Sequence, residues 1–214
     1  KIFKLKKRSK KNPLIVHYYN LKMLNNDCEL NNNFYKLYKK FCPGPITFVL
    51  KLKKKSKISK NVTNNKKTLA VRFPKHHTTR KLLKVLKYPL AAPSANISNK
   101  ISPVSKKDVE DEFGKNIKFI LEGGRSKIGL ESTIVSLLNK PKILRLGGIE
   151  IKEIKKIVKT NLKFNNKIKK IFMPGQGKLH YSPGIPIRLN IKKPMPNEAF
   201  ILIKKRKLSK KNFY

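Results

Sequence analysis

Residues 42–52 read Cys42-Pro43-Gly44-Pro45-Ile46-Thr47-Phe48-Val49-Leu50-Lys51-Leu52. Two prolines around a glycine restrict the backbone and predict a rigid turn. The seven residues after the turn are rich in β-branched and aromatic side chains, which is typical of a β-strand. We therefore expect a turn that leads directly into a strand. The turn itself is either purely structural or part of a pocket wall.

Similar patterns extend in both directions from this stretch. Apolar alternation predicts further strands at 13–17, 68–73, 117–121, 133–138 and 142–146. Helical spacing of apolar residues appears at 33–41, 77–87, 105–113 and 150–159. Strands and helices mix without regular βαβ spacing. The sequence therefore predicts an α/β (α+β) fold, with a twisted mixed β-sheet and flanking helices.

The clearest helix boundaries are those of the segment 105–113. Ser105 is a favourable N-cap, and Asp108 lies three residues later, near the positive end of the helix dipole. Gly114 follows the last residue of the periodic pattern and predicts the end of the helix.

The composition changes after residue 160. Residues 161–186 are rich in Lys, Asn, Gly and Pro and have little periodicity, which predicts a linker. The run 199–203 predicts the first strand of a second domain. The chain begins at Lys1, inside another strand-like run that contains Ile2, Phe3 and Leu5. We expect both ends to be cut from a longer protein.

The chain is strongly basic. It has 53 Lys and Arg residues against 11 Asp and Glu, a formal net charge of +42. Such a charge favours contact with nucleic acid. The lysines are nevertheless scattered among many Asn and Ile residues, which is typical of coding DNA rich in A and T. Both explanations stay open, and codon bias is the one we favour.

Arginine is rare in this lysine-rich chain and marks the first candidate sites. A planar, bidentate donor suits phosphates and carboxylates, for which lysine is a poor substitute. The arginines that lie in motif-like segments are Arg8, Arg72 and Arg145. Two cysteines, Cys28 and Cys42, lack the spacing of a disulfide framework or a zinc site, which favours a reducing compartment. No apolar stretch has the length of a membrane span.

Six segments combine turn residues with side chains that bind phosphates or carboxylates. They are 6–12, 42–47, 68–74, 91–103, 123–135 and 174–183. Each alone also fits a solvated loop, a structural turn or a chance cluster. The Gly123-Gly124 pair is not a Walker loop, because no Gly-Lys-Ser/Thr follows at the required spacing.

The order of the segments is far more specific than any one of them. Read in sequence, they are KxR…NPLIVH, PGPITFVL, TLAVRFP, APSANIS…SP, GLESTIV, LRLGGI and PGxxxxHYSP. In this order the chain resembles the YrdC-like family of threonylcarbamoyl-AMP synthases, and most of all its long form with a HYSP linker. The resemblance covers about residues 1–186. It implies a YrdC-like catalytic domain at 1–160, the linker at 161–186 and the start of a truncated C-terminal domain at 187–214.

The resemblance implies an L-threonylcarbamoyladenylate synthase with a concave basic face. ATP would be bound by Arg8, Asn12, Thr68, Ser94, Ser102, Arg145 and Tyr181. Threonine would be bound by His17, Arg72, Ala92 and Ser132. Lys6 and Arg8 would act electrostatically, with no residue as nucleophile, and Asn96 would shape its loop. Tyr181, in the linker, would close over the nucleotide as a lid.

The implied reaction condenses threonine, bicarbonate or CO₂, and ATP into threonylcarbamoyl-AMP and pyrophosphate. Mg²⁺ is expected to enter with ATP, because the sequence has no carboxylate cluster to hold it. The expected partner is a cytoplasmic threonylcarbamoyl transferase that modifies tRNA. The family's N-terminal P-T-[ED]-T-x-Y-G-L segment, which carries a threonine-contacting Thr, is missing here. Lys7, Ser9 and Leu146 also depart from the family pattern. We therefore expect this chain by itself to have little activity.

Two rival functions remain. A double-stranded RNA-binding module would use the same basic face, although an aromatic platform for stacking bases is missing. Carbamoyl-transfer enzymes also contain YrdC-like domains, but a HYSP linker is not expected in them. We expect RNA binding, where it occurs, to be weak and non-specific.

Overall fold

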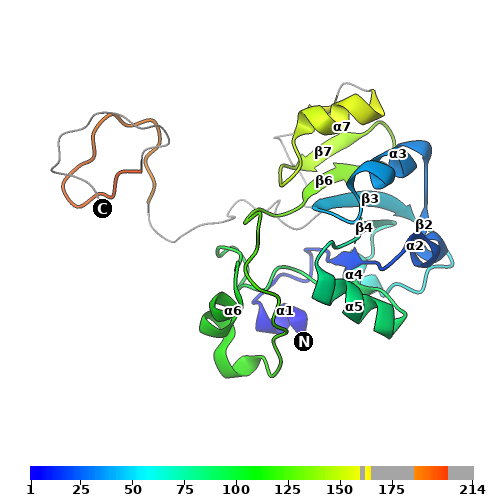
Figure 1. Ribbon diagram of the computed structural model, residues 1–214, viewed down its shortest axis with the longest axis horizontal. Coiled ribbons are helices and arrows are strands. Elements are labelled where there is room, and N and C mark those ends of the chain that lie inside the picture. Colours follow the sequence, from blue (N-terminus) through cyan, green and yellow to red (C-terminus); the bar gives the residue numbers. More distant parts are fainter. Residues whose placement is uncertain (160–161, 165–185, 202–214) are drawn as a thin grey trace. The chain divides into compact units, whose positions relative to one another are not determined.

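The computed structural model describes residues 1–159, 162–164 and 186–201 (Figure 1). The chain divides into two compact units, Lys1–Ser182 and Pro183–Tyr214. In the second unit the described residues form turns and bends, and Arg188 donates from Nε to Glu198 Oε1 at 2.7 Å. Among the described residues, no helix has both the length and the apolar character needed to cross a membrane.

A mixed sheet of eight strands forms the centre of the first unit. Its order is β5-β1-β4-β3-β6-β7-β8, and β2 pairs with β3 beside this path. Five strands confirm the predictions: β1 (Ile15–His17), β3 (Ile46–Leu52), β4 (Thr68–Arg72), β6 (Thr133–Ser136) and β7 (Lys142–Arg145). Three strands of two residues were not expected: β2 (Cys28–Glu29), β5 (Leu90–Ala91) and β8 (Lys163–Phe164). Strand β8 lies beyond the predicted start of the linker.

Helices flank this sheet, which confirms the predicted mixed α/β architecture. Four match the predicted segments: α3 (Asn32–Phe41), α5 (His77–Leu86), α6 (Lys106–Phe113) and α7 (Ile151–Val158). Three were not predicted: α1 (Ile2–Leu5), α2 (Leu21–Asp27) and α4 (Lys60–Thr63). Helix α6 begins as expected, because Ser105 Oγ accepts from the Asp108 N–H at 3.2 Å and the Asp108 carboxylate accepts from the Ser105 N–H at 3.0 Å. It ends at Gly114, also as expected.

The two faces of the sheet differ in how they are covered. One face buries the larger apolar cluster, in which strand residues such as Phe48 and Val71 pack with Phe34 of α3 and Ile154 of α7. The opposite face carries only a small cluster: Ile15, Val49, Ala70 and Ile134, with Leu144 packed against it. Alternation along each strand produces this division. Figure 1 shows α3 and α7 together on one side of the sheet, while α1, α5 and α6 lie on the other.

Two predicted strands are wrong. Residues 117–121 alternate in polarity but form no strand, and Phe119 is 87% exposed. Alternation shows that a segment could be half-buried, but it does not supply a neighbouring strand to bond with. Residues Ile2–Leu5 form a single helical turn instead of a strand. In the second unit, residues 199–201 have no regular structure, and the rest of the predicted strand lies outside the described residues.

Candidate active site

One row of paired residues crosses the open face of the sheet. His17 on β1 pairs with Arg72 on β4, and Arg72 pairs with Thr47 on β3. Thr47 pairs with Ile134 on β6, which in turn pairs with Arg145 on β7. Directly paired residues point to the same face of a sheet. The row therefore gathers polar side chains from four strands, with Ile134 of β6 between Thr47 and Arg145.

A β-bulge in β7 brings Arg145 into this row. Ile134 pairs with Arg145, while the next residue, Val135, pairs with Ile143, so Leu144 is the extra residue. Ile143 belongs to the larger apolar cluster, whereas Leu144 packs against the smaller one. Arg145 follows on the same open face as Leu144. A bulge re-aims the side chains that follow it, and here it directs a guanidinium at the site.

A cavity of about 530 Å³ lies over this face. Its floor includes Ile15, His17 and Arg72, with Leu83 of α5 at one side. One wall is the loop 92–104, and the other consists of Gly129 to Ser132 together with Arg145. Among the described lining residues there are five Lys or Arg side chains and one carboxylate: Lys6, Arg8, Arg72, Lys100, Arg145 and Glu131. This composition suits an anionic ligand.

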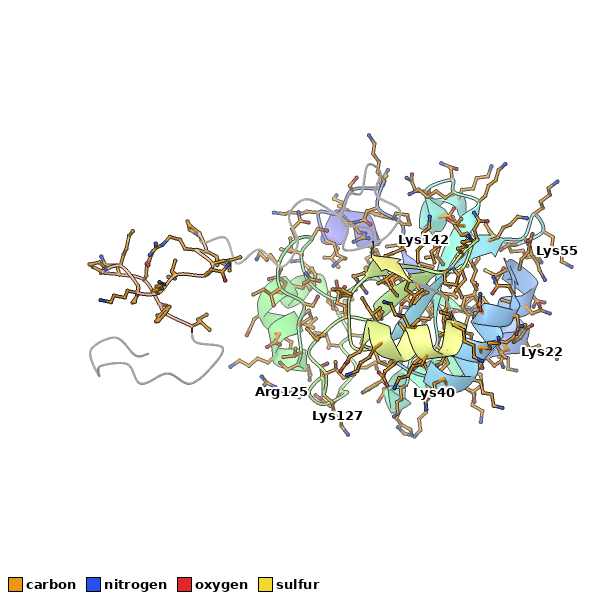
Figure 2. All side chains as sticks on the ribbon, turned by 90° about the horizontal axis from the view of Figure 1, so that it is seen from above. Lys22, Lys40, Lys55, Arg125, Lys127 and Lys142 are labelled. Carbon is orange, nitrogen blue, oxygen red and sulfur yellow. The ribbon has the colours of Figure 1, made fainter. Side chains whose placement is uncertain are left out.

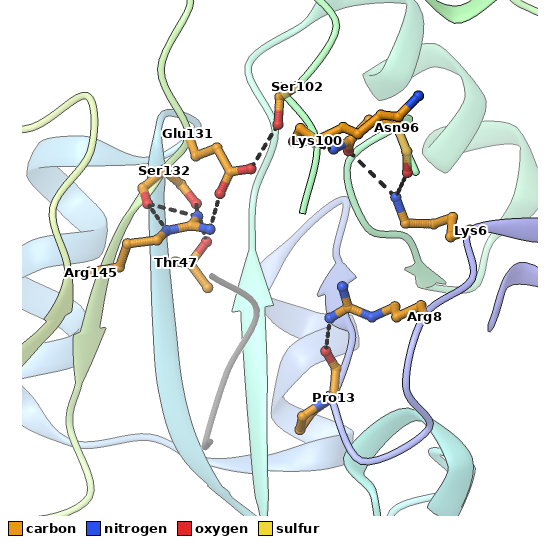
Figure 3. Close-up of polar contacts among 10 residues, drawn as sticks. All are labelled: Lys6, Arg8, Pro13, Thr47, Asn96, Lys100, Ser102, Glu131, Ser132 and Arg145. Atoms are coloured by element: carbon orange, nitrogen blue, oxygen red, sulfur yellow. Dashed lines mark hydrogen bonds and ion pairs between the residues drawn. The ribbon is translucent and has the colours of Figure 1, made fainter. Parts of the chain in front are cut away.

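Lys6 joins α1 to the loop wall. Its ammonium group donates to the carbonyl oxygens of Ser94 (2.6 Å) and Asn96, and the side chain is almost fully buried (Figure 3). Burial, and after it the charge of Arg8, lowers the pKa of Lys6 to about 8. The Asn96 side-chain amide donates to the carbonyls of Ile97 and Lys100, at 3.0 and 2.7 Å. Asn96 therefore shapes the turn on which Lys6 rests.

Arg8 lies over the adjoining part of the pocket. It donates from Nη2 to the Pro13 carbonyl at 2.9 Å and from Nε to the Asn12 carbonyl at 3.3 Å (Figure 3). Burial lowers the pKa of Arg8 to about 10. Asn12 Oδ1 is buried and has no hydrogen-bond partner among the described residues. A buried polar atom without a partner is costly, so Asn12 is a natural contact for a ligand.

The floor pairs a neutral imidazole with a guanidinium. His17 Nδ1 lies 3.3 Å from the Leu90 carbonyl. Burial, and after it the neighbouring charge of Arg72, lowers the pKa of His17 to about 4. Burial also lowers the pKa of Arg72, and the charge of Arg145 acts in the same direction. Arg72 Nε is buried without a partner among the described residues. An oriented N–H is therefore available for an acceptor from a ligand.

The second wall is a network centred on Arg145 (Figure 3). Its Nε and Nη2 donate to the Ser132 carbonyl at 3.1 and 2.9 Å, and Nη2 also reaches Ser132 Oγ at 3.0 Å. Its Nη1 forms an ion pair with Glu131. Glu131 accepts from Ser102 Oγ at 3.0 Å, and Ser132 Oγ lies 2.7 Å from Thr47 Oγ1. The guanidinium thus organises the Glu131–Ser132 backbone and side chains in this structure.

Gly147 allows the chain to close behind this network. A Cβ at position 147 would overlap the backbone of residues 131–133. The Gly148 N–H donates to the Glu131 carbonyl at 3.0 Å. Only glycine permits this close approach of two backbone segments.

Most of the residues predicted for the site line this same pocket: Lys6, Arg8, Asn12, His17, Arg72, Ala92, Ser94, Ser102, Ser132 and Arg145. Thr68 does not. It lies at the opposite end of β4 from Arg72, and four residues of strand rise about 13 Å. The family resemblance assigns Thr68 to ATP and Arg72 to threonine, and the assignment of Thr68 stays a prediction. Tyr181 and the HYSP motif lie outside the described residues.

Two residues of the network were not predicted from the sequence. Thr47 is fully buried in the row across the sheet, and Glu131 bridges the two walls. Both stand inside quoted motifs, PGPIT and GLEST. The available signal was their position: Thr47 opens a strand beside the rigid turn, and Glu131 is an acidic residue in a very basic chain.

The remaining positive charge is not gathered at the pocket. Figure 2 shows Lys22, Lys40, Lys55, Lys127 and Lys142 projecting from different elements of the first unit. All five are exposed. The described residues include no group of three or more His, Cys, Asp or Glu side chains that would hold a metal ion. Cys28 and Cys42 are free thiols.

Comparisons with known proteins show the family to which this chain belongs. The Sua5/YciO/YrdC family model, described as "Telomere recombination", matches residues 1–147. The chain is 35% identical to the threonylcarbamoyl-AMP synthase of Pyrococcus abyssi over 87% of its length and 56% of that relative. For the Bacillus subtilis protein of the same name the values are 33%, 88% and 56%. The chain spans about half the length of these curated relatives.

Solved structures give the same result. The crystal structure of P. abyssi Sua5 complexed with L-threonine matches with a TM-score of 0.80 and 36% identity, covering 85% of this chain and 55% of that one. Escherichia coli YciO matches with a TM-score of 0.63 at 20% identity, covering 72% and 74% of the two chains, which speaks for the fold alone.

Proposed function

Because this chain belongs to the Sua5/YciO/YrdC family, we propose that it contributes the catalytic pocket of an L-threonylcarbamoyladenylate synthase. The observation that carries this proposal is the floor of the pocket. Arg72 presents a buried N–H without a partner among the described residues, beside the neutral His17. A relative at 36% identity was crystallised with L-threonine, and a carboxylate suits the paired donors of an arginine.

The proposed reaction has two steps. The amine of threonine attacks CO₂ and loses a proton, which gives an N-carboxylate. An oxygen of that carboxylate then attacks the α-phosphorus of ATP, and pyrophosphate leaves. Neither step needs a protein nucleophile. The protein would hold the reactants in line and stabilise charge on the phosphates, as in other phosphoryl transfers.

The individual roles are those that the family resemblance implies, and they are proposed here for the residues that line the pocket. Arg72, His17, Ala92 and Ser132 would bind threonine. Arg8, Asn12, Ser94, Ser102 and Arg145 would bind the nucleotide, with Lys6 beneath them as a fixed positive charge. Thr68 is not among the residues that line the pocket, so this proposal does not rest on it. A lid formed by Tyr181 remains part of the proposal.

Mg²⁺ would enter as the counter-ion of ATP and help to neutralise its phosphates. The single carboxylate among the described lining residues, Glu131, is already engaged by Arg145 and Ser102. This donor set fits a cation held by phosphates and water and not by a protein cage. We further propose that the product passes to a threonylcarbamoyl transferase that modifies tRNA in the cytoplasm.

The test is the joint substrate requirement. We expect pyrophosphate release to need threonine, bicarbonate and ATP together, with threonylcarbamoyl-adenylate detected by mass spectrometry. The assay should be run on the whole chain and on a protein extended to the length of its relatives. If the rate of pyrophosphate release does not depend on threonine or on bicarbonate in both proteins, the proposal is contradicted.

A further inference from the structure

Glu131 occupies an unusual position for an acidic residue. It is the one carboxylate among the described residues that line the cationic pocket. Its side chain is 16% exposed, and that of its partner Arg145 is 10% exposed. One carboxylate oxygen accepts from Ser102 at 3.0 Å, and the other pairs with Arg145 (Figure 3). Glu131 therefore ties together the two walls between which a ligand would lie.

We propose that Glu131 is a positioning residue for this pocket, and that it also acts as the internal counter-ion that limits unproductive binding of anions. The positioning half rests on the proposed function, because it assigns Arg145 and Ser102 to the nucleotide. The counter-ion half concerns any small polyanion. It follows from the charge of the pocket alone.

The geometry explains the positioning. The guanidinium of Arg145 is planar; its Nε and Nη2 donate to Ser132, and its Nη1 pairs with Glu131. Without the carboxylate, Nη1 would lose its ion pair with Glu131, which helps to fix the orientation of the guanidinium. Ser102 would at the same time lose the acceptor that fixes its hydroxyl. Small displacements of positioning groups have large effects on the rate of a reaction that depends on alignment.

The electrostatics explain the counter-ion role. Burial is the main influence on the pKa of Lys6, Arg8 and Arg72, and it lowers all three. The charge of Glu131 acts in the opposite direction on each of them. Glu131 therefore offsets part of the mutual repulsion of these cations in the ligand-free pocket. An incoming polyanion would meet the same negative charge as a repulsive term.

Two variants separate the effect of the Glu131 charge from the effect of its side-chain length. Glu131→Gln keeps the shape and an oxygen acceptor for Ser102 but removes the charge. Glu131→Asp keeps the charge, but its side chain is one methylene shorter and does not span both partners. The measurements are kcat and KM for ATP, together with the affinity for inorganic pyrophosphate by titration calorimetry.

We expect Glu131→Gln to bind pyrophosphate more tightly, by on the order of tenfold, because a nearby negative charge is lost. Its kcat falls by about tenfold or more, the effect of losing one charge-assisted hydrogen bond. Glu131→Asp keeps the pyrophosphate affinity near that of the unchanged protein while its kcat falls. A variant that is merely unstable would weaken binding and turnover together, and thermal unfolding identifies it.

Glu29→Gln is the matched control. Glu29 is exposed, pairs with Lys51 at the surface, and its loss changes the net charge by the same amount. We expect no change in either measurement. An unaltered kcat in Glu131→Gln, or weaker pyrophosphate binding in a folded Glu131→Gln, overturns the inference. The turnover measurements use the protein extended to the length of its relatives. If that protein without substitutions turns over no substrate, the proposed function fails instead, and the pyrophosphate comparison still decides the counter-ion role.

Discussion

His17 and Arg72 are direct neighbours in the parallel register of β1 and β4, and both side chains line the pocket. Because the pKa of His17 is lowered to about 4, its imidazole is neutral at physiological pH. The neutral ring carries no charge that would compete with Arg72 for an anionic ligand. The positive charge of Arg72 is therefore left to be neutralised by that anion. Arg72 is therefore the first residue to test against the carboxylate of threonine.

Replacing Arg72 by lysine tests that assignment. Lysine keeps the charge but loses the planar pair of donors, and a charged hydrogen bond is worth about 1.5–3 kcal/mol. We expect Arg72→Lys to raise the KM for threonine by about tenfold or more, with a much smaller change for ATP. Initial rates of pyrophosphate release measure both. Arg125→Lys, on an exposed loop, is the matched control. Equal weakening toward both substrates would show that Arg72 serves another ligand.

Anion binding is expected to depend on the protonation of Lys6. Its pKa is lowered to about 8, so the ammonium form is present below that pH and is lost as the pH rises through it. Pyrophosphate affinity should therefore fall between pH 7 and pH 9. The Lys6→Gln variant should bind more weakly and show a flatter profile, while Lys51→Gln on the exposed end of β3 should keep the normal slope. An identical slope in Lys6→Gln would remove Lys6 from the explanation.

The close approach at Gly147 predicts a steric effect. A Cβ there would overlap backbone atoms of residues 131–133. Backbone atoms cannot move aside as the end of a flexible side chain can. Overpacking of this kind costs about 1–3 kcal/mol or more. We expect Gly147→Ala to lower the unfolding free energy by at least that amount, measured by chemical denaturation. At Gly148 a Cβ would meet side-chain atoms of Ile128 and Pro45 at 3.3 Å, so Gly148→Ala should be milder. The reverse order would contradict this account.

The buried hydroxyl pair of Thr47 and Ser132 gives a second stability test. Both residues are almost completely buried, and their oxygens lie 2.7 Å apart. Thr47→Val keeps the shape but removes one hydrogen bond of Ser132, which keeps its contact with Arg145, so the expected cost is about 0.5–1.5 kcal/mol. Thr47→Ser keeps the hydroxyl and should lose less. Denaturation curves of the two variants decide between them, and a larger loss in Thr47→Ser would assign the effect to packing of the methyl group.

The scattered surface lysines predict the character of any RNA binding. Exposed cations on several of the described elements create a positive field, and contacts from such cations to phosphates carry no sequence information. We expect binding to random RNA duplex to weaken steeply with salt and to show no preference for tRNA. Filter binding across a salt series measures both. Tight binding of tRNA at physiological salt, with clear preference over random duplex, would favour the RNA-binding alternative.

Local patterns were enough to predict the long elements. Strand β3 and helix α6 carry strong signals within their own residues, namely β-branched runs and a capping box. The segment 117–121 shows the limit of this reasoning. Its alternation is as regular as that of a true strand, but pairing depends on an available neighbouring edge, which lies elsewhere in the chain. The single turn Ile2–Leu5 is too short for helical periodicity to be visible.

Sequence motifs predicted which residues line the candidate site, but they did not predict how those residues contact one another. Motif order identified most of the lining residues, including Arg8 and Arg72. It did not identify Glu131, because that residue acts through Arg145 and Ser102, which are 14 and 29 positions away. It also named Thr68, which does not line the pocket, because a motif does not show how far apart the two ends of a strand lie.

The bulge at Leu144 also bears on how β7 selects its pairing. If the strand continued without interruption, Leu144 would pair with Ile134, and Arg145 would turn toward the face covered by α3 and α7. An unpaired guanidinium in that apolar layer would be strongly unfavourable. The charge of Arg145 therefore disfavours the slipped alignment as well as organising the pocket. With an apolar residue at this position, both alignments of β7 against β6 would be accessible. A mutation made to study ligand binding would therefore also change how strictly the strand register is specified during folding.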